Sequence, residues 1–288
     1  MSLTGFVCNV KQSGQLGGAC DSRISPGLSL SPLRDAADVF NDGVSVDICG
    51  IAKGSGMIAP NMATMLGYIG TDAAVPATVL ADSLRAANND SFNTKTVDSD
   101  TSTNDSVFLL ASGMAGNRLI ADANDPALVD FRATLAAVMR DLAIQIVRDG
   151  EGATKLVTID IAGAKTNAIA RQIGLAIANS PLVKTAIAGE DANWGRIVMA
   201  IGKLGIGIPS EAISIDIGGF AVARDGMRIA KYDETPIAAH MTGQMIDLAV
   251  TVGDGDGTAQ VWTCDLTHGY ISITVSYTHL TLPTNREV

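Results

Sequence analysis

A threonine that follows a small residue and a glycine-rich loop is the strongest candidate in this sequence for covalent chemistry. The loop carries one lysine, Lys53, and the chain continues through Ala63 to Thr64. A threonine hydroxyl is a weak nucleophile at neutral pH, but a free α-amino group on the same residue, with an ordinary pKa of about 7.7–8.0, can act as its base. This chemistry requires cleavage of the Ala63–Thr64 bond. On spacing alone, the alternative is a glycine loop followed by a buried threonine in a strand.

The elements that must position these residues alternate between helices and strands. The most regular helical pattern covers residues 126–148, with apolar residues on one face and an end at Asp149 and Gly150. Further helices are expected at 76–88, 166–178 and 234–241, a short segment at 181–188, and strands at 62–69, 106–111, 156–162, 213–217, 227–230, 248–252 and 259–266. The predicted fold class is therefore α/β or α+β, in two or more layers, with a boundary near Thr154.

The composition argues against several classes of protein. The 288 residues include 20 basic and 30 acidic residues, a net charge of −10, which disfavours nucleic acid or an anionic membrane as the main partner. Hydrophobic residues make up 47% of the chain, but no apolar run reaches the ~18 residues of a membrane-spanning helix. The four cysteines and three histidines lack the spacing of a disulfide scaffold or a zinc knuckle. We expect no metal and, without a secretory signal, a cytoplasmic location.

Several motifs in fixed order give a more specific indication. They are residues 53–66, 98–106, 151–155, 180–186 with 189–196, and 265–270. Together they resemble the ornithine acetyltransferase family, the glutamate N-acetyltransferases of arginine biosynthesis, over some three-quarters of the chain. The resemblance implies the layered sheets and helices of the N-terminal-nucleophile-like fold shared by ornithine acetyltransferases and β-aminopeptidases, with a smaller C-terminal α+β domain.

The resemblance also implies a reaction. The precursor would cut itself between Ala63 and Thr64, and Thr64 would take the acetyl group of N2-acetyl-L-ornithine and pass it to L-glutamate through an acetyl-threonine. Its own amine, or a water held by it, would serve as general base and then as acid. Lys53 would bind the α-carboxylate common to both substrates, and Glu151 the ornithine δ-ammonium. The alternatives are a solvated loop lysine and a surface acid at a helix end.

The same resemblance implies that no cofactor is needed, with acetyl-CoA as an alternative acetyl donor in some members. The two fragments left by cleavage would associate, as an α2β2 heterotetramer, and the other partners would be small-molecule substrates. An acidic stretch with Asp98, Asp100 and Asp105 lacks the spacing of an EF-hand and is expected to form a hydroxyl-rich network of turns near the catalytic strand.

Two other polar stretches have plain structural interpretations. Residues 253–257 alternate glycine and aspartate and are expected to form a tight turn between two strands rather than a calcium site. Glu190, Asn193, Trp194 and Arg196 could reach an active site, but a structural ion pair with tryptophan packing explains them equally well.

The domain organisation follows the extent of the resemblance. Residues 1–32 are interpreted as a poorly matched leader, 33–154 as the catalytic domain with the processing site at 63/64, and 155–275 as the C-terminal α+β domain. Residues 276–288 resemble translated sequencing adaptor and are set aside, together with His279.

Two departures from the family pattern indicate a fragment. A Thr-Gly pair far upstream supplies the family's oxyanion hole, and the only such pair before Thr64, at Thr4 and Gly5, has the wrong spacing. Loss of such donors would lower the rate by about 10²–10³-fold. Thr274 stands where the family has a C-terminal asparagine. The alternatives to a transferase are therefore an N-terminal-nucleophile amidase or aminopeptidase, or a catalytically incompetent fragment that only binds ligand.

Overall fold

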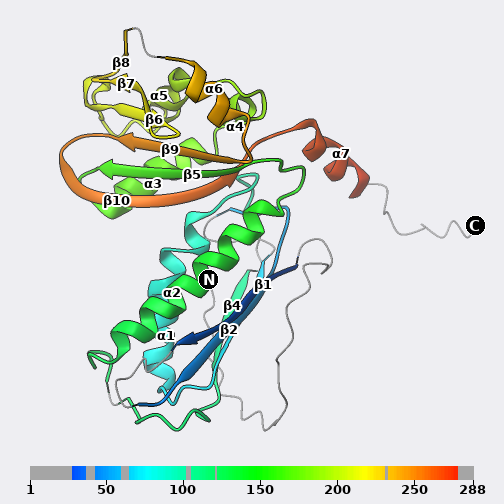
Figure 1. Ribbon diagram of the computed structural model, residues 1–288, viewed down its shortest axis with the longest axis vertical. Helices are drawn as coiled ribbons and strands as arrows, with labels where there is room; N and C mark the ends of the chain where they lie inside the picture. Colours follow the sequence, from blue (N-terminus) through cyan, green and yellow to red (C-terminus); the bar gives the residue numbers. More distant parts are fainter. Residues whose placement is uncertain are drawn as a thin grey trace, which may run out of the picture. The chain divides into compact units, whose positions relative to one another are not determined.

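The computed structural model divides into two compact units, Met1–Asp149 and Gly150–Val288 (Figure 1). It describes residues 28–36, as backbone only, and 43–59, 65–101, 105–120, 122–230 and 233–277. The division comes directly after the long helix α2 (Leu128–Arg148), a little before Thr154, where the sequence analysis placed the boundary. Each unit has a sheet and helices of its own.

The first unit is built on a four-stranded sheet with the strand order β1-β2-β3-β4. Before α2 its elements are, in chain order, β1 (Leu28–Ala36), β2 (Val46–Lys53), β3 (Leu66–Thr71), α1 (Ala77–Asn89), the short 3-10 helix η1 (Phe92–Thr94) and β4 (Ser106–Ala111). The β1–β2 and β2–β3 pairs are antiparallel, whereas β3 and β4 are parallel and are joined through α1 and η1. Helices α1 and α2 pack against each other and against the sheet (Figure 1).

Hydrophobic periodicity explains the helices and strands of this unit. In α2 the side chains of Phe131, Leu135, Val138 and Leu142 are fully buried, which is the stripe expected of a helix that covers a sheet. In β4 buried and partly exposed residues alternate, as the two faces of a strand require. The predicted helices at 76–88 and 126–148 and the strand at 106–111 are therefore confirmed, with ends shifted by at most two residues.

The second unit is built on a six-stranded sheet with the order β10-β5-β9-β6-β7-β8. Its elements are β5 (Leu156–Gly163), α3 (Asn167–Ala178), α4 (Pro181–Ala188), α5 (Trp194–Gly202), η2 (Ser210–Ala212), β6 (Ser214–Ile217), β7 (Phe220–Arg224), β8 (Met227–Arg228), α6 (Thr235–Met241), β9 (Met245–Thr251), β10 (Gly255–Cys264) and α7 (His268–Tyr277). Helix α3 packs on β5 and β10 (Figure 1). Gly174 permits this close approach, because a Cβ there would lie 2.6 Å from Cγ2 of Val261.

Strand β10 does not pair with β9, the strand that precedes it. It runs antiparallel to β5, and β5 in turn pairs with β9 in parallel, so β5 lies between two strands that follow it much later in the sequence. The predicted turn at residues 253–257 is therefore wrong in part. Gly255 and Gly257 already belong to β10, and Gly255 pairs with Gly163 of β5.

Four stretches depart from the expectations of the sequence analysis. Strand β1 includes residues 28–32, which were assigned to the leader, and α7 ends at Tyr277, inside the presumed adaptor tail. Strand β7 was missed because it is short and begins at the exposed Phe220. Helix α5 was also missed, although the side chain of Asn193 caps it by accepting from the Arg196 amide at 3.2 Å.

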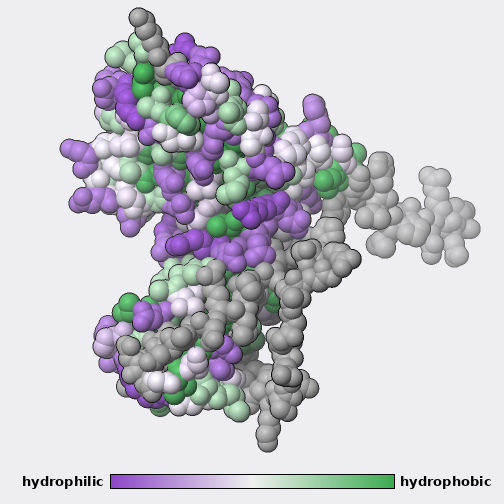
Figure 2. All heavy atoms as spheres, in the orientation of Figure 1, coloured by the Kyte–Doolittle hydropathy of each residue, from purple (hydrophilic) through white to green (hydrophobic). Residues whose placement is uncertain are grey.

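The surface carries both hydrophilic and hydrophobic residues on each unit in the view of Figure 2. Helix α7 exposes apolar side chains, with Ile271 and Val275 exposed by 59% and 52%. Within the described ranges, no helix combines the length and the apolar character needed to span a bilayer.

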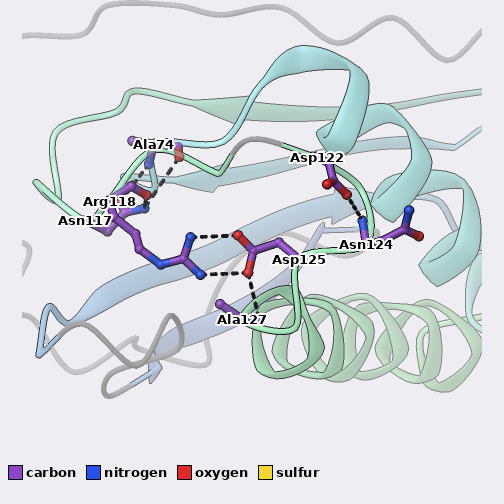
Figure 3. A network of polar contacts seen from close by, with 7 residues as sticks. All are labelled: Ala74, Asn117, Arg118, Asp122, Asn124, Asp125 and Ala127. Atoms are coloured by element: carbon purple, nitrogen blue, oxygen red, sulfur yellow. Dashed lines mark hydrogen bonds and ion pairs between the residues drawn. The ribbon is translucent and has the colours of Figure 1, made fainter.

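An ion pair fixes the chain just before α2. The two guanidinium nitrogens of Arg118 donate to the two carboxylate oxygens of Asp125, each at 2.7 Å, and the amide of Ala127 also donates to Asp125, at 3.0 Å (Figure 3). Nearby, the carbonyl oxygen of the Asn117 side chain accepts from the Ala74 amide at 2.8 Å. The hydrogen bonds from Arg118 are the main reason that the pKa of Asp125 falls to about 2.

Because of this ion pair, we expect the protein to lose stability in acid. A carboxyl group whose folded pKa lies below its ordinary value of 3.8 stabilises the fold above that value, and the contribution is lost as the pH falls towards 2. Replacing Arg118 with alanine should raise the pKa of Asp125 towards 3.8, and so start acid unfolding at a higher pH. An NMR titration of the Asp125 carboxyl carbon measures this shift, and an unchanged pKa in the variant would contradict the assignment.

Candidate active site

Lys53 lies beside the start of the strand that follows Thr64. It is the last residue of β2, its side chain is exposed, and its cross-strand partner is Leu66, the first residue of β3. Directly opposed residues of antiparallel strands lie about 4.5–5.5 Å apart at Cα and project to the same face. Residues 60–64, and with them Ala63 and Thr64, lie outside the described residues.

The chain that leaves β2 has an unusual backbone. Gly54 has φ +158°, where a Cβ would lie 2.9 Å from Cδ1 of Ile58. Met57 has φ +54°, a left-handed conformation that costs a residue with a side chain of order 1–3 kcal/mol. Such a conformation persists only where other contacts hold it, and here the contacts come from a distant acid.

That acid is Asp98, which binds the main chain ahead of the processing site. Its Oδ2 accepts from the Met57 amide at 2.6 Å and its Oδ1 from the Ile58 amide at 3.0 Å. The carbonyl of Ile58 accepts in turn from the Val97 amide at 2.7 Å and from Oγ1 of Thr96 at 3.2 Å. Since the Ile58 side chain is fully buried, this contact anchors the loop to the core.

A second acid, Asp105, binds the main chain behind the processing site. Its Oδ1 accepts from the Met65 amide at 2.6 Å, and the carbonyl of Met65 accepts from the Ser106 amide at 3.1 Å. The contact follows from register, because Ser106 and Leu66 are partners in the parallel β3–β4 pair. The motifs at 53–66 and 98–106 thus meet.

The acidic stretch was expected to form a hydroxyl-rich network of turns near the catalytic strand. It leads into β4 beside β3, and the hydroxyls of Thr96 and Ser99 take part in hydrogen bonds within its turn. Among the described residues, the carboxylates of Asp98 and Asp105 supply the contacts to the loop between β2 and β3, and Thr96 adds one hydroxyl. No group of three or more histidine, cysteine, aspartate or glutamate side chains in the described ranges is arranged to hold a metal ion.

Sequence reasoning also missed a buried lysine next to this stretch. The side chain of Lys95 is 2% exposed, and its Nζ lies 5.6 Å from the centre of the Phe92 ring. Burial lowers the pKa of Lys95 to about 8, and the charge of Asp105 opposes this shift. The only signal in the sequence was its position three residues before the acidic stretch.

Glu151 belongs to the second unit, where a tight backbone contact fixes its neighbour. Gly152 has φ +69°, and its carbonyl accepts from Oγ1 of Thr267 at 2.6 Å. A Cβ on Gly152 would lie 2.1 Å from the backbone nitrogen of Tyr270. The turn that carries the half-buried Glu151 therefore packs against the first turn of α7. The exposed Thr274 lies further along the same helix.

The remaining motifs converge within the second unit. Asp265 is 3% exposed and accepts from the amides of Thr154 and Lys155 at 2.8 and 3.0 Å. The ammonium of Lys155 pairs with Glu190 at 3.2 Å and also donates to the carbonyl of Met241. The motifs at 151–155, 189–196 and 265–270 are therefore joined through one network of hydrogen bonds and an ion pair.

The contacts of the 189–196 motif within the second unit are structural. Glu190 forms the structural ion pair described above, and Trp194 is partly buried against the hydrophobic core. Arg196 donates to the carbonyl of Leu182 at 2.6 Å. The structural interpretation of these three residues is the one that the contacts support.

Comparison with known proteins agrees with this architecture. The layered α/β fold is of the N-terminal-nucleophile type, as expected from the sequence, and matches the crystal structure of the arginine biosynthesis bifunctional protein ArgJ from Bacillus halodurans with a TM-score of 0.68 and 40% identity, over 72% of this chain and 96% of that chain. The model of the ArgJ family matches residues 33–279. The chain therefore belongs to the ArgJ family, and the resemblance described from the motifs is confirmed.

Curated relatives carry the same name, arginine biosynthesis bifunctional protein ArgJ. The protein of Gluconobacter oxydans is 56% identical over 246 residues, which are 85% of this chain and 58% of the relative. Those of Zymomonas mobilis and Ruegeria pomeroyi are 53% and 55% identical, over 83% and 88% of this chain and 59% and 64% of the relatives. The chain thus spans about three-fifths of the length of these relatives.

Proposed function

We propose that this chain is part of a glutamate N-acetyltransferase that moves the acetyl group of N2-acetyl-L-ornithine to L-glutamate through an acetyl-threonine at Thr64. Membership of the ArgJ family, whose relatives are named arginine biosynthesis bifunctional proteins, carries the proposal. The register that sets Lys53 opposite Leu66 supports it, because this brings a cation beside the strand that follows Thr64.

Cleavage between Ala63 and Thr64 prepares the nucleophile. It converts a peptide nitrogen, which cannot accept a proton at neutral pH, into an α-amine with an ordinary pKa of about 7.7–8.0. The hydroxyl of Thr64 loses its proton to this amine as it attacks the acetyl carbonyl, and the same proton passes to the departing nitrogen of ornithine. The α-amine of glutamate then attacks the acetyl-threonine and regenerates the hydroxyl.

Lys53 and Glu151 are proposed to bind the two ends of the substrate. Both substrates carry an α-carboxylate, whereas only acetylornithine carries a side-chain ammonium. Replacing Lys53 with methionine should raise the KM of both substrates by about 10–100-fold, since charged hydrogen bonds contribute roughly 1.5–3 kcal/mol. Replacing Glu151 with glutamine should raise the KM of acetylornithine alone.

Steady-state kinetics of the full-length protein measures these effects. Lys203→Met is the matched control, because Lys203 is an exposed lysine at the end of α5 and is assigned no substrate contact. A Lys53→Met variant with the KM values of that control contradicts the assignment of Lys53. An equal rise of both KM values in Glu151→Gln contradicts that of Glu151.

Mass spectrometry tests the proposed function directly. The full-length protein should yield a fragment that begins at Thr64, and incubation with acetylornithine in the absence of glutamate should make that fragment heavier by one acetyl group on Thr64. No fragment with that start, or no acetyl group on it, would contradict the proposal. Acetate release that is as fast without glutamate as with it would instead favour the N-terminal-nucleophile hydrolase.

The remaining expectations complete the proposal. The acetyl-threonine route uses no cofactor, and acetyl-CoA serves as an alternative donor. The two fragments stay together after cleavage and pair as an α2β2 assembly in the cytoplasm. Light scattering of the cleaved protein measures its mass, and replacement of acetylornithine by acetyl-CoA in the transfer assay measures the use of that donor.

A further inference from the structure

One loop reaches the main chain on both sides of the segment that carries the processing site. We call residues 96–106 the acidic loop; residues 102–104 of it lie outside the described residues. Asp98 accepts from two consecutive amides, of Met57 and Ile58, and Asp105 accepts from the amide of Met65. The two acids are separated by six residues, yet each contacts a different end of the connection between β2 and β3.

The contact of Asp105 acts on the peptide unit next to Thr64. The six atoms from one Cα to the next form a rigid plane, and the N–H of Met65 belongs to the plane that begins at the Cα of Thr64. Asp105 holds this N–H at 2.6 Å, while the Ser106 amide holds the carbonyl of Met65 at 3.1 Å. With both polar groups of Met65 fixed, the direction in which the chain reaches Thr64 is restricted.

The contact of Asp98 acts on the other side. It holds Met57 in its left-handed conformation, and Ile58 is held additionally through its carbonyl by the Val97 amide. Met57 and Ile58 lie between Lys53 and Ala63 in the sequence. Lys53 is four residues before Met57, and Ala63, at the bond that is cut, follows Ile58 along the chain. Asp98 therefore restrains the chain that connects the proposed substrate lysine to the bond that is cut.

We propose that Asp98 and Asp105 are positioning residues, Asp98 for the chain that ends at Ala63 and Asp105 for the chain that begins at Thr64. This inference rests on the proposed function. Before cleavage the acidic loop holds the chain on both sides of the segment that carries the bond, through Met57 and Ile58 on one side and Met65 on the other. After cleavage the two sides are no longer joined by that bond. Asp98 then holds the chain that ends at Ala63, and Asp105 holds the chain that begins at Thr64.

The charge of Asp105 opposes the effect of burial, which lowers the pKa of Lys95, so this carboxylate and the buried ammonium attract each other. A charged acceptor makes hydrogen bonds roughly twice as strong as a neutral one. A neutral amide at position 105 would keep an acceptor oxygen but lose this gain, and would add a competing donor.

The test compares Asp105→Asn and Asp98→Asn in the full-length protein. Each should slow cleavage by about 10-fold or more, since small misplacements of reacting groups cost rate on this scale. In material that has been cleaved, Asp105→Asn should lower kcat by about 10-fold with KM within about twofold. Asp98→Asn should raise KM and leave kcat within about twofold, because it acts on the chain joined to Lys53.

Asp100→Asn is the matched control. Asp100 lies in the same loop, and among the described residues its contact is the donation from its backbone amide to Asp98, which the substitution keeps. This variant should cleave and turn over within about twofold of the unchanged protein. If Asp98→Asn and Asp105→Asn behave like this control, the inference is wrong. It is also wrong if kcat in Asp105→Asn falls only in proportion to the amount of folded protein lost.

Two further outcomes keep the test decisive. Where Asp105→Asn does not fold, Asp105→Glu keeps the charge and displaces the carboxylate by one methylene; slow cleavage of its folded form supports the inference, and an unchanged rate overturns it. Acetyl transfer by a Thr64→Ala protein would defeat the proposed function itself. Normal cleavage in both aspartate variants, with Thr64 still essential, would defeat this inference alone.

Discussion

Replacing Thr64 with alanine in the full-length protein is expected to abolish both chain cleavage and acetyl transfer. The hydroxyl is the atom that would bond to the acetyl group, and no described neighbour can replace it as the start of a new chain. Loss of a covalent nucleophile lowers rates by about 10⁴–10⁶-fold in enzymes that use one. The appearance of the two fragments measures cleavage, and the formation of N-acetylglutamate measures transfer.

The variant Thr64→Ser is the control for this substitution. It keeps a hydroxyl and an α-amine and removes only a methyl group, so it should still cleave and form an acetyl-enzyme, at a reduced rate. Transfer that persists in Thr64→Ala, at a rate comparable with Thr64→Ser, would show that the acetyl group travels by another route.

Replacing Gly152 with alanine is expected to destabilise the second unit by about 2–5 kcal/mol. The new Cβ would lie 2.1 Å from the backbone nitrogen of Tyr270 and 2.6 Å from the carbonyl carbon of Gly269, and backbone atoms cannot rotate aside as a side chain can. The left-handed φ of +69° adds about 1–2 kcal/mol for a residue with a Cβ. Denaturant unfolding of this chain measures the loss.

Gly205→Ala separates these two costs. Gly205 has φ +64°, and a Cβ there would meet no atom within 4 Å, so the substitution carries only the cost of the left-handed conformation, about 1–2 kcal/mol. Equal losses in the two variants would contradict a close contact between Gly152 and α7. A larger loss in Gly152→Ala would support this contact. The new Cβ would then also push away the turn that carries Glu151.

The elements with strong local patterns could be predicted from the sequence. The stripe of α2 and the alternation of β4 need only a hydrophobic period, and both elements end where capping or the end of the pattern requires. Strand β7 was missed because its five residues carry too little pattern, whereas α5 was missed although the capping residue Asn193 precedes it. The family and the expected chemistry came from the motifs together, and composition alone did not indicate them.

The contacts of the candidate site could not be predicted from spacing. That Lys53 faces Leu66 depends on the antiparallel register of β2 and β3, and that Asp105 meets Met65 depends on the parallel register of β3 and β4. Register is set by packing of the whole sheet against its helices, which no local pattern contains. The acidic stretch was therefore located near the site by resemblance, while its action through carboxylates required the coordinates.

The position of β5 between β9 and β10 has a consequence for synthesis of the protein. In the first unit, β1, β2 and β3 pair with their neighbours in sequence and can do so as they leave the ribosome, whereas β5 has no partner until residues 245–264 have been made. Pairings between distant segments form slowly and leave apolar surface uncovered in the meantime. A nascent chain that stops before β9 would therefore display the apolar faces of β5 and α3, and we expect chaperones to bind it there.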